Sequence, residues 1–178
     1  MEFEKACEDG DFEKVKTLFN NNIPFDERNK CLKLASEGGH LEVVKYLFGK
    51  GADVTAEDNQ AILTASWHGH LEVVKYLVEK GADVHAGDDY ALRYASCFGY
   101  LEVVKYLVEK GANVHAKNEH ALKLASYYGN VEVVRFLAEN GANMNEAVRL
   151  AFEIRNLSVA SVFIVLFVYY VIIEYANQ

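Results

Sequence analysis

The chain has 178 residues, of which 25% are charged, and its formal net charge is −8 at pH 7. This acidic balance argues against a nucleic-acid-binding protein, which would carry a basic patch or stripe, and it suits a scaffold with a basic partner. The three cysteines are odd in number and lack a CxxC spacing, so neither a disulfide framework nor a zinc site is indicated. An intracellular, reducing setting is expected, and the first residues do not resemble a secretory signal.

A repeat of 30 residues organises most of the chain. Its best copies read GHLEVVKYLVEKGADVHA and GYLEVVKYLVEKGANVHA, and the glycine that begins each copy recurs at Gly39, Gly69, Gly99 and Gly129. A fixed period of this size indicates a solenoid of stacked units, because no single unit can bury its apolar face alone.

The period divides the chain into six units. The first is a diverged copy whose many charges suit the outer face of a capping unit. The last is degenerate and has Arg155 in the place of the glycine. In chain order the predicted units are 1–29, 30–59, 60–89, 90–119, 120–145 and 146–178.

Each regular unit is expected to contain two helices, as residues 60–89 illustrate. The first helix begins near QAILTASW, where Asp58 or Asn59 is placed to cap its start. The second, LEVVKYLVEK, carries its apolar residues on one face at helical spacing. Gly81 supplies the left-handed residue that ends this helix, and ADVHAGDD is expected to follow as an extended, hairpin-like loop.

These segments resemble ankyrin repeats. GHLEVVKYL and GADVHA match the second helix and loop of that family, and ALRYAS and ALKLAS match its first helix, in phase over about residues 1–150. The period is shorter than the family's usual 33 or so, and the familiar TPLH is replaced by QAIL, YALR and HALK. In this shortened form the pattern is similar to the ankyrin repeat proteins of amoeba-infecting giant viruses.

The resemblance implies an all-α ankyrin solenoid that binds a partner protein on its concave face, with short loops and a shallow groove. The binding positions of the family follow the Ala-Ser pair of each first helix. Here they hold Trp67, His68, Cys97, Phe98, Tyr127 and Tyr128, flanked by Arg93 and Lys123. Rigid aromatic side chains are typical of binding hot spots. The alternative is that these side chains fill gaps between the stacked helices.

No motif for chemistry stands in a suitable context. A Gly-rich phosphate loop, GxSxG and HExxH are all missing from the sequence, so no catalytic residue and no cofactor are expected. His85 and His115 lie one period apart but lack two further ligands, so no metal is expected either. The loop acids Asp88 and Asp89 either attract a basic segment of a partner or cap a solvated turn.

An uncharged run, LSVASVFIVLFVYYVII, occupies residues 157–173 between Arg155 and Glu174. Its length lies at the lower edge of a membrane-spanning helix, roughly 17–25 residues. Basic residues precede it and none follow, so a tail anchor that leaves the repeats in the cytosol is one interpretation. A decayed last unit packed on the stack or on another copy is the second, and a truncated or frame-altered end is the third.

The sequence therefore predicts an intracellular protein–protein interaction scaffold without chemistry of its own and without a nucleic-acid partner. Two further hypotheses stay open. One is the same scaffold held at a membrane through residues 157–173. The other is a regulator that occludes the site of a host enzyme.

Overall fold

The computed structural model describes residues 2–143 together with residues 145 and 149. Within these residues the secondary structure consists of ten helices and no strand. They are α1 Glu2–Asp9, α2 Phe12–Leu18, α3 Phe25–Glu37, α4 Leu41–Gly49, α5 Ala56–Trp67, α6 Leu71–Glu79, α7 Ala86–Phe98, α8 Leu101–Glu109, α9 Ala116–Tyr128 and α10 Val131–Glu139.

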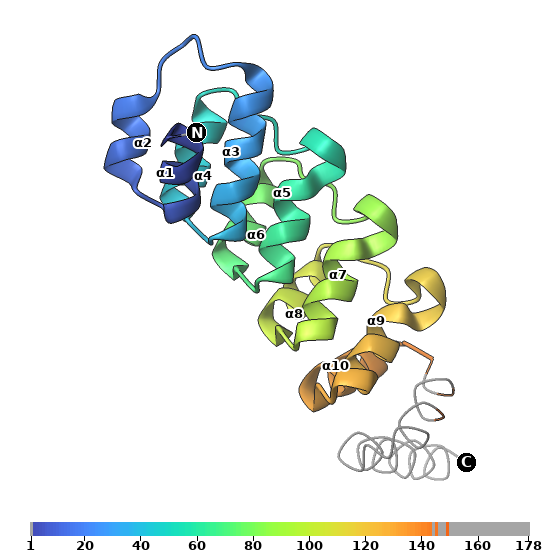
Figure 1. Cartoon of the computed structure of the whole chain (residues 1–178). Helices are drawn as coiled ribbons and strands as arrows, with labels where there is room; N and C mark the ends of the chain where they lie inside the picture. Colours follow the sequence, from blue (N-terminus) through green and yellow to red (C-terminus); the bar gives the residue numbers. More distant parts are fainter. Residues whose placement is uncertain (1, 144, 146–148, 150–178) are drawn as a thin grey trace, which may run out of the picture.

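Successive helices form antiparallel pairs that stack into a two-layered solenoid (Figure 1). The odd-numbered helices lie side by side in one layer, and the even-numbered helices form the other. The odd-numbered helices pack more closely against one another than the even-numbered helices do. The all-α repeat solenoid predicted from the 30-residue period is confirmed.

One leucine or isoleucine per helix supplies the centre of the core. In the odd-numbered helices these residues are Leu32, Ile62, Leu92 and Leu122, and in the even-numbered helices Leu47, Leu77, Leu107 and Leu137. Each is at most 1% exposed. Burial of one such side chain stabilises the fold by roughly 1.5–3 kcal/mol. Because the position recurs in every helix pair, this contribution is repeated along the stack.

A side chain of the following pair covers the tight turn between the helices of each pair. Gly39 has a φ of +74°, and a Cβ built on it would lie 2.5 Å from Nδ1 of His70. His70 Nε2 in turn donates to the carbonyl oxygen of Glu37 at 2.8 Å. The turn therefore needs glycine both for its left-handed backbone and for the close approach of the imidazole.

The loop before each first helix differs from the extended hairpin that the sequence predicts. Glu57, Asp58 and Asn59 are left-handed in succession, with φ values of 50°, 54° and 67°. The same turn recurs at Gly87–Asp89 and at Lys117–Glu119. Regular right-handed helix begins only after this left-handed turn, which connects the two helices without the longer loop that an extended hairpin would need.

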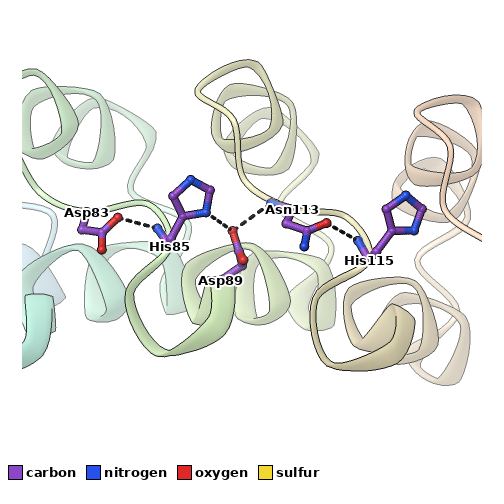
Figure 2. A network of polar contacts seen from close by, with 5 residues as sticks. All are labelled: Asp83, His85, Asp89, Asn113 and His115. Atoms are coloured by element: carbon purple, nitrogen blue, oxygen red, sulfur yellow. Dashed lines mark hydrogen bonds and ion pairs between the residues drawn. The ribbon is translucent and has the colours of Figure 1, made fainter.

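Two of these left-handed turns end in a residue that binds the next loop rather than its own helix. Asn59 Oδ1 accepts from the backbone N–H of Asp83 at 2.8 Å, so it does not cap α5 as predicted. Asp89 does the same for Asn113 at 2.8 Å, and its Oδ1 also lies 3.0 Å from Nδ1 of His85 (Figure 2). Asp89 is 4% exposed and thus is not a solvated tip. These bonds fix the spacing of neighbouring loops.

The run at residues 157–173 and most of the predicted sixth unit lie outside the described residues. Among the helices that the structure does describe, none is long and apolar enough to cross a membrane.

Candidate functional site

A groove of about 630 Å³ lies on the layer of odd-numbered helices and follows α5 between α3 and α7. The lining comes from three helices and the residue after α5: Glu37 from the end of α3, Asp58, Gln60, Leu63, Thr64 and Trp67 from α5, His68 after it, and Gly87, Tyr90 and Tyr94 from α7. The apolar floor is thus shared between two neighbouring helices, and the carboxylates stand at its two ends.

Four aromatic rings form a continuous row, and three of them, Tyr90, Tyr94 and Trp67, line this groove. The centroid distances are 4.6 Å from Tyr90 to Tyr94, 4.2 Å from Tyr94 to Trp67 and 5.1 Å from Trp67 to Phe98. Trp67 and Phe98 nevertheless keep 40% and 44% of their surface exposed. The rings therefore hold one another in place across two helix pairs while presenting apolar surface to the solvent.

Tyr94 of this row is a neutral donor and acceptor. Burial, together with a hydrogen bond to Tyr90, raises the pKa of Tyr94 to about 12. A hydroxyl with so high a pKa does not ionise at neutral pH. The formally charged residues of the lining are Glu37 and Asp58.

The structure brings together some of the predicted site residues and separates others. Trp67 and His68 line the groove, and Phe98 contacts Trp67. Cys97 is half-buried, and burial raises the pKa of its thiol. Tyr127 and Tyr128 are exposed on α9, where their rings contact each other at 5.1 Å, but they do not belong to the groove lining. Lys123 is half-buried on the same helix.

Arg93 does not flank the groove as an exposed side chain, because it is only 6% exposed. Its guanidinium lies 4.0 Å over the ring of Tyr90, and Nη1 is 3.4 Å from Nδ1 of His120. Burial, with the charge of Arg93 adding to it, lowers the pKa of His120. Arg93 therefore supports one face of Tyr90 from below.

The groove residues that the sequence reasoning missed include Tyr90 and Tyr94. Tyr90 and Tyr94 are four residues apart on one helix, so they lie on the same face. This spacing is the signal that was available. Their meeting with Trp67, which comes from the preceding helix pair, depends on how α5 and α7 stack.

Within the part of the chain that the structure describes, no group of three or more His, Cys, Asp or Glu side chains is placed to hold a metal ion. The described groove is thus a surface of aromatic rings, neutral polar groups and two carboxylates. Such a surface binds by shape, apolar contact and charge.

Comparison with known proteins gives one finding for the whole repeat region. The family profile described as ankyrin repeats, in three copies, matches residues 3–88 and 87–147. These two segments together cover most of the 178 residues. No curated protein matches the chain.

Proposed function

Because the chain belongs to the ankyrin repeat family, whose repeats are generally scaffolds for protein–protein interaction, we propose that it binds a partner protein across the groove along α5. Members of this family are typically not enzymes. We expect the partner on the concave side, where the first helix of each repeat lies. Here the first helices are the odd-numbered ones, α3, α5 and α7 among them.

The exposed aromatic row is the observation that carries this proposal. Trp67 and Phe98 keep about two fifths of their surface in solvent although apolar neighbours surround them. Trp and Tyr dominate the binding energy of many interfaces because they bury a large area with few rotatable bonds. Contacts along the row already restrict Trp67 from both sides, so little side-chain freedom remains to be lost on binding.

Two substitutions on the full chain test this function. Trp67→Ala and Phe98→Ala should remove most of the capture of the partner by the immobilised protein, while helical content by circular dichroism stays unchanged. The matched control is Phe25→Ala, since Phe25 is 52% exposed but does not line the groove. Capture that survives both substitutions in the aromatic row would exclude the row as the binding surface.

The similarity of the short period to the arrays of amoeba-infecting giant viruses makes a host protein the partner to seek. If that partner is an enzyme, occlusion of its site follows as the mode of action. Inhibition of the captured enzyme by the wild-type chain, but not by the Trp67→Ala variant, is the corresponding measurement. An inhibitory Trp67→Ala variant would argue against this mode.

A membrane tether through residues 157–173 is a separate proposal, supported by the uncharged run of 17 residues. A chain that ends at Asn156 should then leave the membrane fraction, whereas the full chain should sediment with it. Full-length protein that stays in the supernatant would exclude the tether without affecting the groove.

A further inference from the structure

The charges of the groove along α5 are of one sign. Its lining includes two formally charged residues, Glu37 and Asp58, and both are acidic. Among the described residues, neither carboxylate has a hydrogen bond or an ion pair with another side chain. The lining contains no lysine or arginine, and the whole chain carries a net charge of −8. The electrostatic complement of this groove is therefore a cation.

The next helix pair shows how a cation fits beside such a carboxylate. Asp88 stands one period after Asp58, and its Oδ2 lies 2.8 Å from Nζ of Lys117. A hydrogen bond from this ammonium lowers the pKa of Asp88. The residue that corresponds to Lys117 one period earlier is Gly87, which has no side chain and lines the groove. The place that a lysine takes beside Asp88 is thus open beside Asp58.

The aromatic rings of the groove also favour a cationic ligand. A guanidinium or ammonium group is attracted to the face of an aromatic ring, most strongly to tryptophan. The protein makes this contact itself, since the guanidinium of Arg93 covers one face of Tyr90 at 4.0 Å. Trp67 is 40% exposed and stands at the end of α5, beside Glu37 in the lining. A cationic side chain placed there meets a ring and a carboxylate together.

The distance between the two carboxylates sets a spacing for the ligand. Asp58 lies in the left-handed turn at the start of α5 and Glu37 lies at the end of α3, so the right-handed part of α5 separates them by about 12 Å along the helix axis, at roughly 1.5 Å per residue. An extended chain covers this distance in about four residues, and side chains four apart point to the same side. We infer that the groove holds an extended basic segment of the partner, with two arginine or lysine side chains about four residues apart. This inference rests on the proposed function and names the chemistry of the partner.

The first test uses Trp67 as the reporter, because it is the one tryptophan of the chain. The probe is a synthetic peptide of glycine and serine with two arginines separated by three residues. Titration into the full-length protein should change the tryptophan emission saturably, and added salt should weaken binding. A peptide with citrulline in place of both arginines keeps the shape but loses the charge, and it should bind at least about tenfold more weakly. Equal affinity of the two peptides overturns the inference.

Substitutions of the carboxylates form the second test. Asp58→Asn and Glu37→Gln should each weaken the arginine peptide about threefold without changing helical content. The matched control is Glu72→Gln, which removes the same charge on α6, where Glu72 pairs with Lys75 at 2.8 Å outside the groove. If the control weakens binding as much as the two groove variants do, the effect is one of net charge and the assignment of the site is wrong.

Gly87→Lys tests the comparison between neighbouring pairs directly. It should place an ammonium group beside Asp58, as Lys117 is placed beside Asp88, and thereby block the arginine peptide. Any Cβ at Gly87 meets Cδ2 of Tyr90 at 2.7 Å, so Gly87→Ala serves as the control for the shift of that ring. The lysine variant should weaken binding several-fold more than the alanine variant. Equal losses in both would overturn the cation site.

The outcomes also separate this inference from the proposed function. If Trp67→Ala abolishes capture of the partner protein while Asp58→Asn and Glu37→Gln leave it unchanged, the groove binds a partner of different chemistry. If the arginine peptide binds and none of the groove variants affects partner capture, the partner uses another surface and the proposed function fails.

Discussion

Three even-numbered helices of this molecule, α4, α6 and α8, are nearly identical to one another, whereas the odd-numbered helices beside them are not. α6 and α8 share the sequence LEVVKYLVE, and α4 has LEVVKYLFG. Each of the three carries the same surface ion pair, such as Lys75 with Glu72 and Lys105 with Glu102. α5, α7 and α9 instead end in different residues, among them Trp67, Phe98 and Tyr128.

This difference separates two tasks. Each even-numbered helix meets the same kind of neighbour, so the same side chains serve at every level of the stack. The ends of the odd-numbered helices face solvent and have no such constraint. Under the proposed function, their variation from pair to pair reflects what binds there, and the aromatic row is found where the sequence of the units diverges.

The largest expected effect comes from a substitution in the core of the repeated, even-numbered helices. Leu77→Ala removes a fully buried side chain from α6 and should cost about 2–5 kcal/mol in the free energy of unfolding. Trp67→Ala, on the divergent side, loses ring contacts worth about 0.5–1.5 kcal/mol each and some burial, so it should cost less. Urea denaturation of both variants gives the comparison. A greater loss of stability for Trp67→Ala would show that the aromatic row is part of the core.

A smaller effect is expected for the side-chain hydrogen bonds that join a left-handed turn to the next loop. Asp89→Ala should cost about 1–3 kcal/mol, because it leaves the backbone N–H of Asn113 without its acceptor. Asp89→Asn should be nearly neutral, since Asn59 makes the equivalent bond one period earlier. The free energies of unfolding of the two variants measure this. Equal destabilisation by both would point to the contact with His85 as the important one.

The smallest effect concerns pH. Burial lowers the pKa of His70 below its ordinary value of 6.5, so the unfolded chain binds the proton more readily than the folded one. Stability should therefore be unaffected above that value and fall as the pH drops from about 6.5 towards the folded pKa. His70→Asn, which copies Asn130, should reduce this acid sensitivity. Urea midpoints at pH 7.5 and pH 5 measure it, and a wild-type protein more stable at pH 5 than at pH 7.5 would contradict it.

The period and its helical spacing were sufficient to predict the solenoid, because stacking repeats the same local pattern. They also placed Trp67 and Phe98 on the surface. The left-handed turn at Glu57–Asn59 could not be predicted in this way, since charged residues seldom adopt positive φ and nothing in their identity requires it.

The groove could not be predicted from the sequence, for a related reason. Its wall needs Tyr94 of α7 against Trp67 of α5, and only the packing of two helix pairs brings them within 4.2 Å. Arg93 shows the same limit. An arginine in a variable position is expected in solvent, but Arg93 is only 6% exposed and contacts the ring of Tyr90 and His120 from the next pair.

The cover that His70 places over the turn at Gly39 gives the stack a direction. The side chain that covers a turn comes from the later pair: His40 donates to the carbonyl oxygen of Glu8, and His70 donates to that of Glu37. Loss of a later pair therefore uncovers the turn before it, whereas loss of an earlier pair leaves the following turn covered. Amide protection from hydrogen exchange should accordingly be lost first in the C-terminal pairs and last in the N-terminal ones.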